Sequence, residues 1–110
     1  MEAARLSRAA VVPLKSRTVL RDPLRRQIKR TVISVDGTSH RLRVVAVRPG
    51  THKGRRTVLI TVSTDNTQAE AHVHIACERL EYPEFVASLL AHAVRGVLTD
   101  ELSPDAVEAL

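Results

Sequence analysis

The chain has 110 residues, of which 44% are hydrophobic, and it contains one Phe, one Tyr, no Trp and one cysteine. This length allows a single domain with a modest, aliphatic core, and one cysteine excludes an intramolecular disulfide. A lone cysteine fits a reducing compartment, and we expect a cytoplasmic location. No apolar run approaches the roughly 20 residues of a membrane span, so we expect no membrane partner.

Charge is divided sharply between the two parts of the sequence. Residues 1–60 hold 15 Lys and Arg against three acids, a net charge of +12, whereas residues 61–110 hold two bases against nine acids, a net charge of −7. Such a division favours a polyanionic partner, above all nucleic acid, for the basic part. The competing interpretation is a dipolar domain whose charges compensate one another internally.

The N-terminal segment, residues 1–21, shows no sustained period of two or of 3.6, and we expect a flexible basic arm ahead of a single domain at 22–110. Its Arg-rich and Ala-rich composition loosely resembles an organellar transit peptide, but plain disordered leaders share that composition. Asp22 as a cap and Pro23 in the first turn then favour the start of a helix. Its alternative is an extended basic linker.

Residues 31–78 predict an antiparallel sheet of three or four strands. A short β-branched strand at 31–35 precedes the turn dipeptide Asp36-Gly37, and strands follow at 41–48 and 57–63. On the second strand, alternation places Leu42, Val44 and Ala46 on one face and Arg41, Arg43, Val45 and Val47 on the other. We expect the connection around residues 48–56 to be a basic loop, too long for a tight hairpin.

Residues 70–78 show the clearest alternation in the chain. Ala71, Val73, Ile75 and Cys77 form an apolar row that we expect in the core, whereas Glu70, His72 and His74 share the wet face. Two His and a carboxylate on one face are candidate ligands for a transition metal, with a fourth ligand drawn from His52 or His40. A solvated strand face or a pH-sensitive interface explains them more simply, so we expect no metal or other cofactor.

The hydrophobic period changes to that of a helix at Pro83, and an apolar stripe continues to about Leu98. We expect this helix to cover one face of the sheet, which gives a small α+β domain. Ser103-Pro104 then predicts a short acidic turn or helix that runs to Leu110.

The leading functional hypothesis is a non-enzymatic nucleic-acid-binding protein, because the sequence has no Gly-rich phosphate loop, zinc-ligand motif or nucleophile elbow. The expected phosphate contacts are Arg25, Arg26, Lys29, Arg30, Arg48, Lys53, Arg55 and Arg56. Since no aromatic residues interleave with these bases, we expect a duplex or structured nucleic acid, bound with low specificity. The alternative is a structural or adaptor protein that self-associates or docks a protein partner through an exposed sheet face made of Arg43, Val45, Val47 and Leu59.

Overall fold

A computed structural model describes residues 20–101 and 107–108 of the chain. They form one sheet in the order β1-β2-β3-β4-β5, in which the first four strands are antiparallel. The strands are β1 (Val32–Val35), β2 (Thr38–His52), β3 (Arg55–Thr64), β4 (Ala71–Ala76) and β5 (Val107–Glu108). The helices are α2 (Asp22–Arg30), the 3-10 helix η1 (Cys77–Glu81) and α3 (Pro83–Leu98). The predicted α+β class, with a C-terminal helix after an antiparallel sheet, is confirmed.

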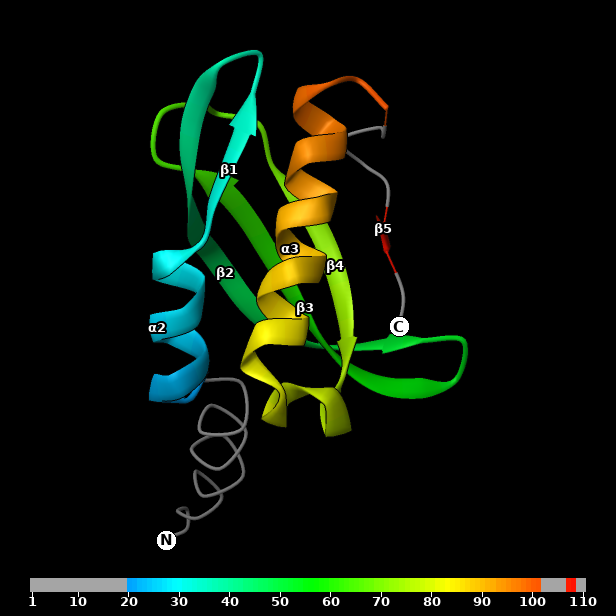
Figure 1. Ribbon diagram of the computed structural model, residues 1–110. Helices are drawn as coiled ribbons and strands as arrows, with labels where there is room; N and C mark the ends of the chain where they lie inside the picture. Colours follow the sequence, from blue (N-terminus) through cyan, green and yellow to red (C-terminus); the bar gives the residue numbers. More distant parts are fainter. Residues whose placement is uncertain (1–19, 102–106, 109–110) are drawn as a thin grey trace, which may run out of the picture.

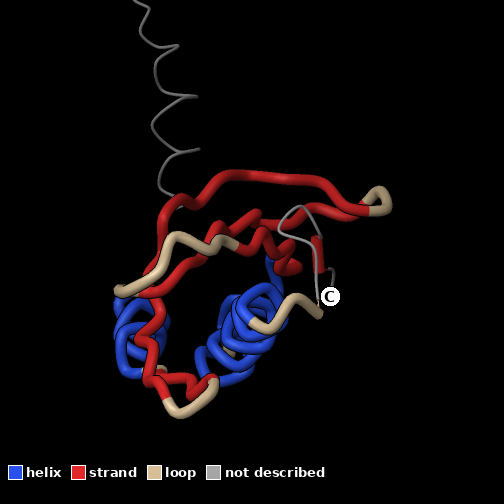
Figure 2. The backbone as a smooth tube through the Cα atoms, turned by 90° about the horizontal axis from the view of Figure 1, so that it is seen from above, coloured by secondary structure: helices blue, strands red, loops and turns tan. Residues whose placement is uncertain are grey.

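The sheet curls around both helices, so that α2 and α3 occupy its inner face (Figures 1 and 2). Val86, Leu90 and Val94 of α3 are fully buried against the sheet, as the predicted apolar stripe requires. α2 packs against α3 and β2 through Leu24 and Ile28, the pair that helical spacing placed on one face. The core is therefore entirely aliphatic.

The predicted basic loop between β2 and β3 is wrong, because both strands continue almost to its tip. β2 runs to His52, β3 begins at Arg55, and only Lys53 and Gly54 form the turn. Their φ angles of 52° and 77° match the left-handed turn that suits a two-residue hairpin. Pro49 fits this long strand because β1 pairs with β2 only up to Arg41, which leaves Pro49 on an open edge.

A β-bulge in β2 changes which side chains face the core. The register between β2 and β3 shifts between Val44 and Ala46, so one extra residue reverses the alternation beyond this point. Val47 then lies opposite the buried Ile60 and packs against the core, where the prediction placed it on the exposed face. Ala46 moves to the opposite, outer face, across from Thr61.

Some helices and strands begin or end one or two residues away from the positions predicted from the sequence. Cys77 is exposed, because β4 stops at Ala76 and Cys77 begins η1 instead of continuing the predicted core row. Arg21 rather than Asp22 is the N-cap of α2, and the buried Leu20 joins the core although it falls within the predicted arm.

Residues 107–108, where we predicted an acidic turn or helix, pair as the short parallel strand β5 with β4. The remainder of that acidic segment and residues 1–19 of the arm lie outside the described residues. Within the described ranges, no helix has the length and apolar character needed to cross a bilayer.

Candidate nucleic-acid interface

The end of the β2–β3 hairpin extends beyond the rest of the sheet. β4 ends at Ala76, opposite Thr57, so residues 51–56 continue as a two-stranded ribbon (Figure 1). Two residue pairs and the turn give this projecting ribbon a length of about 10 Å, at about 3.4 Å per residue. Its conformation follows from the left-handed turn, and apolar packing plays little part in it.

Cations are distributed over both faces and the tip of the ribbon. The strand register places Arg55 on the outer face of the ribbon, Arg56 on the opposite face and Lys53 in the turn. Arg48 lies on the outer face of the sheet just before the ribbon begins, and all four side chains are exposed. Such an arrangement presents positive charge in several directions around one narrow structure. A polyanion that wraps the ribbon would meet these cations on each side.

Only one of these cations is paired with an acid in the described part of the chain. The Arg55 guanidinium donates to Oε2 of Glu78 on η1 at 2.7 Å, and both side chains are more than half exposed. A backbone hydrogen bond at Glu78, together with the Arg55 charge, lowers the pKa of the Glu78 carboxyl. No ion pair with Arg48, Lys53 or Arg56 occurs among the residues described.

The basic face of α2 is a second positive patch. Its cations are all exposed, opposite the buried Leu24 and Ile28; they are Arg25, Arg26, Lys29 and Arg30. In both Figure 1 and Figure 2, α2 and the tip of the ribbon lie on opposite sides of the molecule. The structure therefore divides the predicted phosphate contacts into two patches and does not bring them together into one.

Histidines and threonines line the outer sheet face beside the ribbon. His72 shares a hydrogen bond with the Thr61 hydroxyl at 3.0 Å, and His74 shares one with Thr57 at 2.7 Å. The rings of His74 and His52 lie 5.0 Å apart between centroids. Partial burial, and secondarily the nearby His52, lower the pKa of His74. His52, one of the two further ligands considered from the sequence, reaches this face because β2 continues to residue 52 beyond the bulge.

In the described part of the chain, the candidate ligands considered from the sequence are not brought together around one position. Across residues 20–101 and 107–108, no three His, Cys, Asp or Glu side chains are placed to hold one ion. His40, considered as a further ligand, is buried and shares a 2.6 Å hydrogen bond with Asn66. Glu70 lies one residue before β4 and is exposed.

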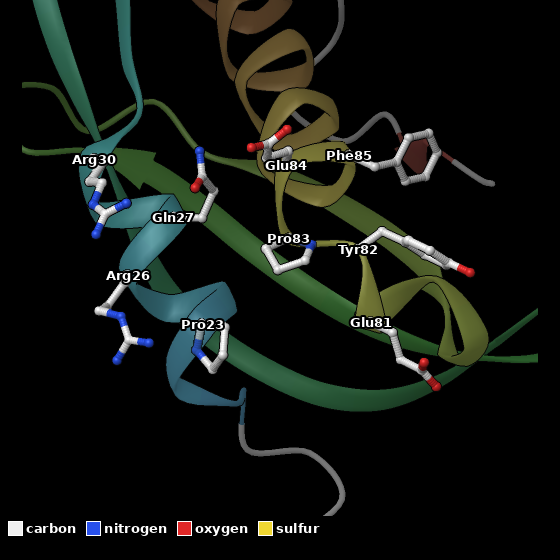
Figure 3. A pocket seen from close by; sticks show the side chains of 9 residues that line it. All are labelled: Pro23, Arg26, Gln27, Arg30, Glu81, Tyr82, Pro83, Glu84 and Phe85. Carbon is white, nitrogen blue, oxygen red and sulfur yellow. The ribbon is translucent and has the colours of Figure 1, made fainter.

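A groove of about 580 Å³ separates α2 from the junction of η1 and α3 (Figure 3). Its lining consists of Pro23, Arg26, Gln27 and Arg30 from α2 and residues 81–85 from the junction. The rings of Tyr82 and Phe85 extend away from α2 in Figure 3, and the two side chains are 57% and 42% exposed. Sequence reasoning missed this cluster, because a tyrosine and phenylalanine around a helix start normally predict packing.

No family model matches the chain, and no curated protein or solved structure matches it significantly.

Proposed function

We propose that this protein is a non-enzymatic nucleic-acid-binding protein that contacts the phosphate backbone of a duplex through the β2–β3 ribbon. The observation that supports this most directly is the projecting ribbon, whose exposed cations on both faces and at the tip are, apart from Arg55, unpaired among the described residues. α2 provides a second basic patch, which reaches phosphates on a separate part of a long or bent duplex.

The dimensions of the ribbon suit a duplex groove. The major groove of B-form DNA is about 12 Å wide and about 8.5 Å deep, and it admits a two-stranded β-ribbon. The projecting length of about 10 Å is close to that depth. Arginines on opposite faces of an inserted ribbon meet the phosphates of both groove walls, and a guanidinium can contact a phosphate through two parallel hydrogen bonds.

The Thr57 hydroxyl and the His74 imidazole share a hydrogen bond. The same arrangement occurs in enzymes in which an imidazole activates a hydroxyl nucleophile. Thr57 is only 7% exposed, which closes its hydroxyl to a substrate. The contact instead satisfies two polar groups on the outer sheet face. It therefore gives no support to an enzymatic alternative.

The alternative hypothesis, a structural or adaptor protein that docks through the exposed sheet face, has less apolar surface to support it than the sequence suggested. It depended on apolar side chains on the exposed sheet face, and the bulge turns Val47 to the inner face, where it is partly buried against the core. Val45 remains 42% exposed and Leu59 is half-buried, so the apolar area left for self-association is small. Salt separates the two hypotheses, since phosphate binding weakens steeply with salt whereas apolar assembly does not.

The test is a fluorescence-anisotropy titration of a labelled random-sequence duplex at several salt concentrations between about 50 and about 200 mM. We expect wild-type affinity to fall linearly on a log–log plot. The ribbon variant Lys53→Asn/Arg55→Gln/Arg56→Gln keeps a residue suited to the left-handed turn, and its slope should be smaller by up to about 2.7, or about 0.9 per lost phosphate contact.

Two matched controls locate the contact. Arg56→Gln and Arg95→Gln each remove one exposed charge, the first from the ribbon and the second from α3, and only the first should weaken binding. Arg55→Lys/Arg56→Lys retains the charge and should lose less affinity than the Gln variants. An absence of binding at the lowest salt, or equal losses for Arg56→Gln and Arg95→Gln, would contradict the proposal.

A further inference from the structure

Both large aromatic residues of the chain are on its surface. The sequence contains one Tyr and one Phe, and neither Tyr82 nor Phe85 contributes to the aliphatic core. Burial of an aromatic side chain normally stabilises a fold, and this fold leaves part of that stabilisation unrealised at both positions. A single exposed aromatic is ordinary, but two rings three residues apart at one helix junction form a local cluster.

A cation completes this cluster. The guanidinium carbon of Arg79 lies 5.5 Å from the centroid of the Phe85 ring, within the range of a cation–π contact. Tyr82 directly precedes α3 and Phe85 lies in its first turn, so the spacing of three residues places both on neighbouring parts of the surface. Arg79, Tyr82 and Phe85 together are called the aromatic platform below.

The aromatic platform begins, along the chain, directly after a residue that contacts the ribbon near its tip. Glu78 of η1 is joined to Arg55 of the ribbon at 2.7 Å. Tyr82 follows Glu78 by four residues, which is about 8 Å along a 3-10 helix at about 2.0 Å per residue. The rings of Tyr82 and Phe85 extend away from α2 in Figure 3, and the ribbon also projects on the side of the molecule away from α2 in Figure 1. Stacking groups and phosphate-binding groups are thus neighbours in the fold, although they are distant in sequence.

We propose that the aromatic platform stacks an unpaired base of the nucleic acid whose phosphates the ribbon holds. This inference rests on the proposed function and narrows its ligand to a duplex that carries a single-stranded end or junction. Aromatic rings and guanidinium planes are the groups on which proteins stack splayed bases, whatever the base.

The charges around the aromatic platform favour a base over a phosphate at this place. Glu81 is exposed next to Tyr82 in sequence and would repel a phosphate, whereas a base is neutral. Glu84 is also exposed, but its carboxylate extends to the α2 side in Figure 3. A carboxylate also accepts hydrogen bonds from the exocyclic amino group of cytosine. We therefore expect the phosphates of the nucleic acid to bind at the basic ribbon and an unpaired base to stack on the two rings.

The experiment compares two labelled ligands, a blunt duplex and the same duplex with a short single-stranded overhang that carries 2-aminopurine at its first unpaired position. For the wild-type protein we expect about tenfold tighter binding of the overhang ligand, together with quenching of the 2-aminopurine fluorescence by stacking. Tyr82→Ala/Phe85→Ala should remove the preference and the quenching, while its affinity for the blunt duplex remains close to that of the wild type.

Several variants serve as controls. Tyr82→Phe keeps a ring and should retain the preference, and Val32→Ala trims another half-exposed hydrophobic residue, on β1, and should also retain it. The ribbon variant described above should weaken binding of both ligands. Thermal unfolding of each variant confirms that it is folded, which we expect because both rings are exposed.

Three other outcomes would overturn the inference, and each would leave a different conclusion about the proposed function. Equal binding of blunt and overhang ligands, with no quenching, would refute stacking and leave the proposed function intact. Capture of a proline-rich peptide that depends on both rings, without an overhang preference, would assign the cluster to peptide recognition instead. Failure to bind either ligand at low salt would refute the proposed function and the inference together.

Discussion

The same two strands, β2 and β3, serve different purposes at their two ends. In the body of the sheet, Ile60 and Val62 are fully buried beneath α3, and their neighbours on β2 and β4 are apolar. In the projecting ribbon, Arg55 and Arg56 are exposed, and the hairpin depends on the Lys53-Gly54 turn. Core packing thus restricts which residues the body of the sheet can contain, whereas exposed residues at the tip can carry charge without disturbing the core. Substitutions in the two regions should separate stability from binding.

The largest expected effect comes from the body. Ile60→Ala leaves a cavity at a fully buried position between β2, β4 and the helices, and we expect it to lower the free energy of unfolding by about 2–5 kcal/mol. Val45→Ala, at the exposed bulge, should stay within about 0.5 kcal/mol of the wild type. Urea titration measures both. Similar losses in the two variants would show that the bulge is packed and that this part of the comparison is wrong.

A smaller effect is expected at the boundary between body and ribbon. A Cβ at Gly50 would lie 3.1 Å from both Cε1 of His74 and Oγ1 of Thr57, so Gly50→Ala must displace the imidazole. We expect a loss of about 1–2 kcal/mol in the free energy of unfolding. In a His74→Ala background the same substitution should cost less, since the ring is absent. Additive losses in this double-mutant cycle would contradict the contact.

The pH dependence of stability should also originate at this boundary. Partial burial and His52 hold the pKa of His74 below 6.5, its value when unfolded, so between these two pKa values the unfolded chain binds more protons. The contribution of neutral His74 is therefore fully present above pH 6.5 and is lost as the pH falls toward the folded pKa. Urea titrations at about pH 7.5 and about pH 5.5 should show a smaller pH difference for His74→Gln than for the wild type. An unchanged difference would assign the dependence to another group.

The smallest effect is expected at the tip. Glu78→Gln releases Arg55 from its exposed ion pair, so stability should hardly change and affinity for a blunt duplex should rise about twofold at low salt. The gain should disappear in an Arg55→Gln background, which is the matched control. A gain that persists there would mean that Glu78 repels the duplex generally and does not compete specifically for Arg55.

Hydrophobic periodicity was enough to predict α3 and the location of the sheet, because buried faces impose a period of 3.6 or of two on the sequence. It failed where one residue alters the alternation. The bulge at Val45 reverses the faces of β2, which turns Val47 to the inner face, and such a bulge leaves no mark in the pattern of apolar residues. The early end of β4 likewise exposes Cys77.

For the candidate interface, too, the sequence predicted some features and the tertiary structure decided others. Sequence alone determined which residues carry charge and that Arg48, Lys53, Arg55 and Arg56 cluster around one hairpin, since neighbours in sequence remain neighbours in a ribbon. Only the tertiary structure decided that α2 lies on the other side of the molecule and that the rings of His52 and His74 lie 5.0 Å apart. It also decided that Glu78, four residues before Tyr82, contacts Arg55 of the ribbon. These spatial relations depend on strand register and helix packing. Both are determined by the free energy of packing the whole core, so no local pattern of residues specifies them.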